Sequence, residues 1–294
     1  MDLRSLRYFV EVVRHGGFAR ASTHAHASQP TLSKAIAQLE NELETRLLER
    51  GRGGVRLTSA GEVVHRHALA MLGESARLRE ELDALRGLKA GTLRLGLPPL
   101  GSSVLFAPLL ARFRLQYPHI DIQLLEHGSR RLEQAVLAGE IEVAATLKPV
   151  GAGLAHQPVR DEPMLALLPQ SHPRASAKRF RLEWLAETPL ILFEEGFALN
   201  RLIREACVRH GVAPQETVRS AQVDFILALV AAGGGVALLP RLVVEGRSLS
   251  GLVPLPLATN DLRWNMVLAW RQDTTLSHAA RAWLALVAGR APDL

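Results

Sequence analysis

The sequence predicts a multidomain α+β protein, with a helical N-terminal region followed by a longer region in which strands and helices alternate. Apolar residues recur at helical spacing through the first ninety residues. After Gly91, short apolar runs alternate with helical patterns. The 294 residues correspond to about two domains at ~150 residues each. We therefore expect a domain boundary near Gly91.

Composition places the chain among globular proteins and favours the cytoplasm. It is 48% hydrophobic and 22% charged, which is enough to build a sizeable core. The single cysteine, Cys207, excludes an internal disulfide and a multi-cysteine metal site, and this predicts a reducing compartment. Charges interrupt the N-terminus before any signal-like apolar run, and no apolar stretch approaches ~18 residues, so we expect neither export nor membrane insertion.

Three helices are expected at the N-terminus. The first, over residues 3–13, has an apolar stripe that ends at His15-Gly16-Gly17. A short helix follows over residues 18–24, then a turn over 25–29. The third helix opens with Ser28 as its cap and Pro30 in its first turn, where a missing N–H costs nothing.

The third helix has two contrasting faces. Leu32, Ile36, Leu39 and Leu43 recur at spacings of four, three and four and define its buried side. The opposite side is small, polar and cationic; it consists of Pro30, Ser33, Lys34, Ala37 and Asn41. Such a face suits a helix that enters the major groove of DNA, although taken alone it also fits an ordinary surface helix.

A basic hairpin is expected directly after this helix. Over residues 47–57, three glycines stand between arginines and apolar ends, a pattern typical of two short strands with a charged turn. The whole chain has a net charge of +6. Arg46, Arg50, Arg52 and Arg56 fall within eleven residues against one acid, Glu49. A solvated basic loop would also explain this cluster, but after a helix-turn-helix it indicates a winged DNA-binding arrangement.

These segments resemble the N-terminal domain of LysR-type transcriptional regulators over about sixty residues. The resemblance rests on the stretches 18–22 (FARAS), 28–36 (SQPTLSKAI), 38–40 (QLE), Leu43, 48–50 (LER) and 55–61 (VRLTSAG). It implies a helix-turn-helix at about 18–37. It also implies DNA contacts by Gln29, Pro30, Thr31, Ser33 and Lys34, and by Arg50, Arg52 and Arg56 on phosphates or in the minor groove. Ala25, Ala27 and Leu48 depart from the usual family residues, which should thin the core below the third helix.

A long helix is expected from Thr58 to about Leu88, opened by a capping box of Ser59 and Glu62. A heptad seam runs along it: Val64, Ala68, Met71, Ser75, Leu78, Leu82 and Leu85. The seam needs a partner, either the C-terminal domain of the same chain or another helix. The family resemblance implies a homodimer through this linker, with two recognition helices on a pseudo-palindromic DNA site, and a dimer of dimers as the homotetramer.

The region beyond Gly91 is expected to be an α/β domain with mainly parallel sheets. Strands are predicted at 92–97, 120–125, 142–147, 164–168, 190–193, 236–239 and 266–270. Helices are predicted at 104–116, 130–138, 198–210 and 223–232. The resemblance implies a two-lobed domain similar to periplasmic binding proteins, with the chain crossing near Asp161 and again near Trp264.

The predicted domains are therefore a winged helix-turn-helix over 1–58, a linker helix over 59–88 and an effector-binding domain over 91–294. In the last, lobe I takes about 91–161 and 266–294, and lobe II takes about 162–265.

A small organic anion is the expected effector. Ser102 and Ser103 follow the first predicted strand and open a helix, and Ser129 caps another, so backbone N–H groups and hydroxyls face a ligand. The resemblance implies that these loops touch the effector. Serines also cap helices without binding anything. Lys148 is expected to supply a cation, and Phe197 and Gln222 to wall the other side.

No enzyme, metal or cofactor chemistry is expected. The pairs His24/His26 and His65/His67 point apart on a helix, and Gly233-Gly234-Gly235 ends a helix where a nucleotide motif would open one. Ser102 lacks a nucleophile motif and an assignable base. Two alternatives remain open: a solute-binding protein, and a small-molecule α/β enzyme with a DNA-binding head.

Overall fold

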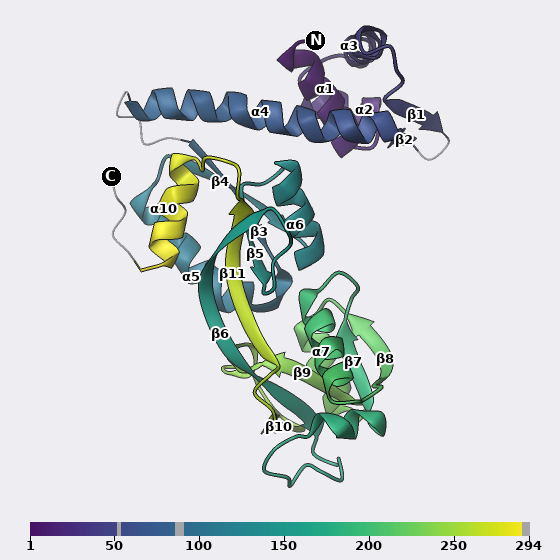
Figure 1. Cartoon of the computed structure of the whole chain (residues 1–294), viewed down its shortest axis with the longest axis vertical. Coiled ribbons are helices and arrows are strands. Elements are labelled where there is room, and N and C mark those ends of the chain that lie inside the picture. Colours follow the sequence, from purple (N-terminus) through teal and green to yellow (C-terminus); the bar gives the residue numbers. More distant parts are fainter. Residues whose placement is uncertain (52–53, 86–90, 290–294) are drawn as a thin grey trace. The chain divides into compact units, whose positions relative to one another are not determined.

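The computed structural model describes residues 1–51, 54–85 and 91–289, and the chain divides into two compact units (Figure 1). The first unit consists mainly of residues 1–88 and the second mainly of 89–294. Among the described residues, no helix is long and apolar enough to cross a membrane.

The first unit begins with three helices around one small core. They are α1 (Leu3–Arg14), α2 (Phe18–His24) and α3 (Gln29–Glu42), as the sequence predicts. Leu6 and Phe9 of α1 pack with Leu32, Ile36 and Leu39 of α3, and all five are fully buried. The Ser28 hydroxyl accepts the Thr31 N–H at 3.3 Å, which confirms the predicted cap.

The predicted hairpin is present. Strand β1 (Leu48–Gly51) pairs antiparallel with β2 (Gly54–Leu57), so that Leu48 faces Leu57 and Glu49 faces Arg56. Between the strands, residues 52–53 lie outside the described part of the chain. Both Val55 and Leu57 pack against the core of the first unit, which anchors one face of the hairpin.

Helix α4 (Ser59–Leu85) is the long helix that the sequence predicts, but its cap is Thr58 and not Ser59. The Thr58 Oγ1 accepts the Gly61 N–H at 2.9 Å, because Ser59 is already the first helical residue. The heptad seam divides into two parts. Val64, Ala68 and Met71 pack on the core of the first unit, whereas Leu78 and Leu82 are 59% and 45% exposed.

The second unit is built on a nine-stranded sheet in which eight strands follow the order β4-β3-β5-β11-β6-β9-β7-β8. Lobe I contains β3 (Gly91–Leu97), β4 (Ile120–Glu126) and β5 (Val143–Leu147). Its helices are α5 (Pro99–Gln116), α6 (Ser129–Ala138) and α10 (His278–Val287). The first two strands of this lobe run parallel, as do β3 and β5.

Lobe II repeats this plan. Its strands are β7 (Pro189–Phe193), β8 (Gln215–Ser220), β9 (Val236–Pro240) and β10 (Leu252–Pro256). Its helices are α7 (Ala198–Arg209), α8 (Val223–Ala231), α9 (Arg241–Val244) and the 3₁₀ turn Leu182–Ala186. Strand β7 runs parallel to both β8 and β9.

Two long strands join the lobes (Figure 1). They are β6 (Leu154–Pro169) and β11 (Arg263–Arg271), which pair antiparallel with a register shift between Met266 and Val267. Asp161 and Trp264, where the crossings were expected, lie within these strands. Because β11 also pairs antiparallel with β5, and β6 with β9 and β10, the sheet is mixed and not mainly parallel.

Candidate nucleic-acid interface and ligand cavities

The solvent-facing side of α3 contains the residues expected at DNA. Gln29, Pro30, Thr31 and Lys34 are exposed in the first unit, and Ser33 is half-buried. All five lie in the first two turns of the helix, where free N–H groups and the helix dipole favour a negative charge. The buried leucines behind them fix the helix to the core.

The hairpin carries at least one free basic side chain. Arg56 is exposed on β2. The backbone of Arg50 lies in β1, but its side chain is outside the described part of the structure, as is the whole of Arg52. Their predicted contacts therefore stay predictions.

Glu40 ties the end of α3 to the start of the hairpin. Its Oε1 accepts the backbone N–H of Leu47 at 2.7 Å and that of Leu48 at 3.1 Å. The Thr58 hydroxyl donates to the Arg46 carbonyl at 2.7 Å from the other side. Sequence reasoning assigned no role to Glu40, because an acid near the end of a helix usually faces solvent.

Gly61 lets α4 approach this junction closely. A Cβ on Gly61 would lie 2.0 Å from the Leu47 carbonyl oxygen and 3.1 Å from a Leu57 methyl group. A side chain is therefore excluded unless the backbone shifts. The hairpin, α3 and α4 form one tightly connected platform.

In the second unit, contacts between the lobes include two sets beside α6 and α7. The Arg130 N–H donates to the Gly196 carbonyl at 3.3 Å, and a Cβ on Gly128 would lie 2.8 Å from that same oxygen. Arg201 of α7 donates through Nη2 to the Pro149 carbonyl at 3.2 Å. Two cavities lie beside these contacts.

The first, which we call the Ser129 cavity, has a volume of about 590 Å³. Ser129 and Phe197, two of the predicted effector residues, both line it. Lobe I contributes Arg130 and Glu133, and α7 contributes Arg201 and Arg204. The cavity is therefore rich in guanidinium groups.

Arg204 is held in place by a carboxylate. Its Nε and Nη2 donate to both Glu216 oxygens at 2.6 and 2.8 Å, and Arg219 donates to Glu216 at 2.9 Å. These hydrogen bonds lower the pKa of Glu216 from 4.5 to about 2. The geometry fixes the orientation of Arg204 at the cavity wall.

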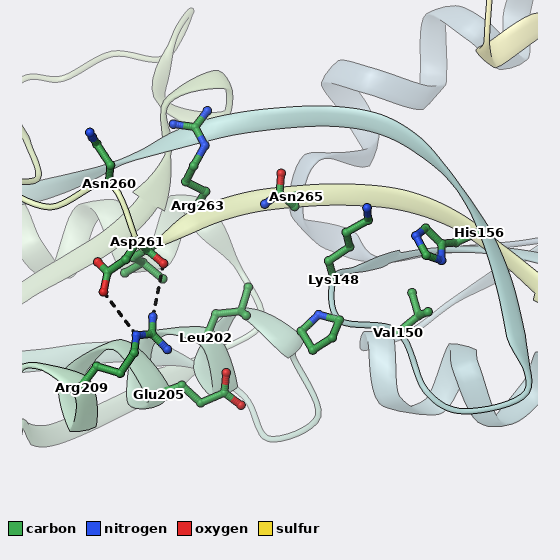
Figure 2. A pocket seen from close by; sticks show the side chains of 12 residues that line it. Lys148, Val150, His156, Leu202, Glu205, Arg209, Asn260, Asp261, Arg263 and Asn265 are labelled. Atoms are coloured by element: carbon green, nitrogen blue, oxygen red, sulfur yellow. Dashed lines mark hydrogen bonds and ion pairs between the residues drawn. The ribbon is translucent and has the colours of Figure 1, made fainter.

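The second cavity lies under the crossing strands and has a volume of about 720 Å³ (Figure 2). We call it the Lys148 cavity. Lys148 and His156 come from lobe I, Leu202 and Glu205 from α7, and Asn265 from β11. Pro149 and Val150 line both cavities. The structure thus places Lys148 apart from Ser129 and Phe197.

Three predicted effector residues line neither cavity. Ser102 is buried and its hydroxyl donates to the Pro98 carbonyl, whereas Ser103 and Gln222 are exposed. Next to Ser102, a Cβ on Gly101 would lie 2.6 Å from the Trp264 ring, so this indole packs directly on the turn. Gly101 has a φ of 88°, a conformation that favours glycine.

Within the described ranges, no group of three or more His, Cys, Asp or Glu side chains is placed to hold a metal ion. His15 and His24 stack at 3.9 Å between ring centroids, and His15 also lies 3.2 Å from a Glu11 oxygen. These contacts account for both rings within the first unit.

Two family models match the chain. Residues 3–62 match "Bacterial regulatory helix-turn-helix protein, lysR family", and residues 86–292 match "LysR substrate binding domain". The second match alone spans more than half of the chain.

Relatives and solved structures agree with these matches. An uncharacterized HTH-type transcriptional regulator of Bacillus subtilis, YwbI, is 35% identical over 97% of this chain and 95% of its own length. The hydrogen peroxide-inducible genes activator of Pectobacterium carotovorum is 30% identical, over 94% of this chain and 92% of its own. A full-length OxyR variant from Pseudomonas aeruginosa has a TM-score of 0.77 at 28% identity, covering 98% of this chain and 94% of that one.

Proposed function

The chain belongs to the LysR family of transcriptional regulators, and from that membership we propose how its parts divide the work. The protein is a sequence-specific DNA-binding regulator whose activity responds to a small-molecule effector, and it is not an enzyme. We assign DNA binding to residues 1–58, dimerisation to 59–88 and effector binding to 91–294. Because its target is DNA, we place its action in the cytoplasm.

We propose that α3 lies in the major groove. The observation that supports this is the contrast between its two sides: Leu32, Ile36 and Leu39 are buried, while Gln29 and Lys34 are exposed. Pro30, Thr31 and Ser33 complete the short surface that approaches base edges. Arg50, Arg52 and Arg56 of the hairpin then reach phosphates or the minor groove, which positions the helix without reading sequence.

A second copy of the chain would cover the exposed part of the heptad seam on the linker helix. Leu78 and Leu82 continue a seam whose first half is packed on the core of the first unit, and these two exposed leucines favour an equivalent helix as partner. Such a homodimer presents two α3 helices to a pseudo-palindromic site. We propose that two dimers associate into a tetramer.

For the effector we favour a small organic anion in the Ser129 cavity. Ser129 and Phe197 come from different lobes, and Arg130, Arg201 and Arg204 line the same cavity. Arg204 is paired with Glu216 and Arg201 with Glu205, so among the described residues Arg130 is the lining arginine whose side chain is left for an anion. A ligand that contacts both lobes stabilises one arrangement of the lobes over others and so shifts a population. Ser102, Ser103 and Gln222 line neither cavity, so we do not include them in this effector site.

A peroxide-sensing thiol is a poor alternative for this chain, despite its relatives named for hydrogen peroxide. Cys207 is the single cysteine in these 294 residues and is 1% exposed. Burial raises the pKa of its thiol, which disfavours the reactive thiolate. We therefore propose reversible ligand binding as the signal.

Fluorescence anisotropy with labelled duplexes from the region upstream of the gene tests the DNA-binding proposal. The full-length chain should bind these duplexes at low ionic strength more tightly than duplexes of shuffled sequence. Equal binding of both, with no effect of Lys34→Ala on the difference, would contradict the role of α3. A thermal-shift screen of organic acids and neutral analogues tests the effector class.

A further inference from the structure

We propose that the Lys148 cavity is a second ligand site, selective for a monocarboxylate with an apolar body. The proposed effector site does not use this cavity. Its volume of about 720 Å³ falls within the usual range for small-molecule sites, roughly 300–1,000 Å³. Some charged side chains of the lining are paired with a residue of opposite charge and others are not, and this difference determines which ligand fits.

Three polar side chains that can donate a hydrogen bond lie on one wall of the Lys148 cavity. Lys148 directly follows β5 and Asn265 lies beside it on β11, where the Lys148 N–H donates to the Asn265 carbonyl at 3.0 Å. Figure 2 shows the Lys148 ammonium, the Asn265 amide and the His156 ring along the same strand wall. Within the described residues, none of these three side chains has a hydrogen-bond or ion-pair partner. Together they suit a carboxylate.

The two arginines of the lining are already paired. Arg209 donates to the Asp261 carboxylate at 3.3 Å and to its carbonyl at 3.2 Å (Figure 2). Arg263 donates to Asp161 at 2.7 Å. Lys148 is therefore the cation that a ligand meets without displacing a carboxylate.

The opposite wall disfavours a second negative charge. Glu205 projects from α7, and its nearest cation is Arg201 at 3.5 Å, which also donates to the Pro149 carbonyl. Asp261 also lines the cavity but is already paired with Arg209, so Glu205 is the carboxylate that matters on this side. A dicarboxylate would bring its far end toward Glu205, and like charges at close range repel.

Apolar side chains fill the space between these walls. Pro149 and Val150 come from lobe I, and Leu202 and Leu262 come from lobe II. They provide a surface for a hydrocarbon body between the carboxylate and α7. Because the lining spans both lobes, a bound monocarboxylate would stabilise one lobe arrangement, as would an effector in the Ser129 cavity.

Isothermal titration of the full-length protein with three six-carbon probes tests this site. Hexanoate has one carboxylate, adipate has two, and hexan-1-ol has none. We expect hexanoate to bind at least tenfold more tightly than either of the others. Lys148→Met should weaken hexanoate binding at least tenfold, because a charge-assisted hydrogen bond is lost. Glu205→Gln should strengthen adipate binding several-fold and leave hexanol unchanged.

Matched controls separate this site from the effector proposal. Lys178→Met makes the same change at an exposed lysine outside both cavities and should leave hexanoate affinity unchanged. Ser129→Ala should also leave hexanoate affinity unchanged. Equal affinities for hexanoate and hexanol, or wild-type hexanoate affinity in Lys148→Met, would overturn the proposal. If Ser129→Ala abolished hexanoate binding, the ligand would lie in the other cavity, which overturns this inference and leaves the proposed effector site intact.

Discussion

The carboxylate of Glu40 accepts the backbone N–H of Leu47 at 2.7 Å, and this contact connects the last turn of α3 to the hairpin that follows it. The adjacent N–H of Leu48 donates to the same oxygen. Both leucines are buried, so neither N–H has water as an alternative partner. Glu40 therefore contributes directly to holding the hairpin against α3.

Glu40→Ala should destabilise the first unit by about 1–3 kcal/mol, because two buried donors lose their acceptor. All four tryptophans (184, 264, 270 and 283) lie in the second unit, so their fluorescence does not report this change. Hydrogen exchange at Leu47 and Leu48 is the suitable measurement. Glu62→Ala, on the exposed side of α4, is the control, and equal protection in both variants would contradict the role of Glu40.

Gly61→Ala should destabilise the first unit more than Glu40→Ala does. The added Cβ would meet the Leu47 carbonyl oxygen at 2.0 Å, so either α4 or the hairpin must move. Gly73→Ala, in the same helix, meets no atom within 4 Å and should stabilise the helix by up to about 1 kcal/mol. Circular dichroism during thermal unfolding distinguishes the two substitutions, which should shift the transition in opposite directions.

Lys34→Ala and Arg56→Ala should weaken DNA binding in different ways. Loss of Lys34 should reduce the preference for the specific duplex over a shuffled one. Loss of Arg56 should weaken both duplexes similarly and reduce the slope of log K against log salt by about 0.9, the value for one phosphate contact. Anisotropy titrations at four salt concentrations give both quantities; an unchanged slope in Arg56→Ala would remove this arginine from the phosphate contacts.

Glu216 should make the second unit sensitive to acid. Its pKa is about 2 in the folded protein and 4.5 for an unperturbed glutamate, so its contribution is complete above pH 4.5 and is lost as the pH falls toward 2. Glu216→Gln should lower the free energy of unfolding by roughly 1–3 kcal/mol at pH 7. It should also flatten the decline between pH 4.5 and 2. Urea titrations followed by tryptophan fluorescence measure this, with the exposed Glu194→Gln as control.

Cys207→Ala should retain DNA binding, and hydrogen peroxide should change the DNA affinity of neither protein. The thiol is buried in α7 and its pKa is raised by that burial, so little thiolate is available to react. Anisotropy before and after peroxide treatment measures the effect. A peroxide-dependent change that Cys207→Ala removes would restore the thiol as the sensor.

The sequence was sufficient for elements whose pattern is local. The leucine spacing of α3 and the glycine-arginine hairpin are both present as predicted. Strand β8 was missed because its residues are mostly polar and exposed, and β10 because Pro254 and Pro256 argue against a strand. Strand β6 was predicted at 164–168 but extends from Leu154, since pairing with β11, about a hundred residues away, sustains its polar half.

For the predicted effector residues, the sequence could not show which side chains line a cavity. Ser102 and Ser129 look alike in sequence, since each follows a strand and opens a helix. Only the fold shows that the Ser102 hydroxyl donates a hydrogen bond to the Pro98 carbonyl, whereas Ser129 lines a cavity. Lys148 faces Glu205 and Leu202 across a space that no local pattern encodes, because β5 and α7 meet there through tertiary packing.

The register shift between Met266 and Val267 interrupts the ladder that connects the lobes. An extra residue in one strand of a pair bends it and increases its twist. Rotation of one lobe against the other would concentrate at this irregular step, since the regular pairs on either side resist torsion. Because both connecting strands pair regularly on either side of this step, a change that restored a regular register here should resist lobe rotation and lower any ligand affinity that depends on that rotation.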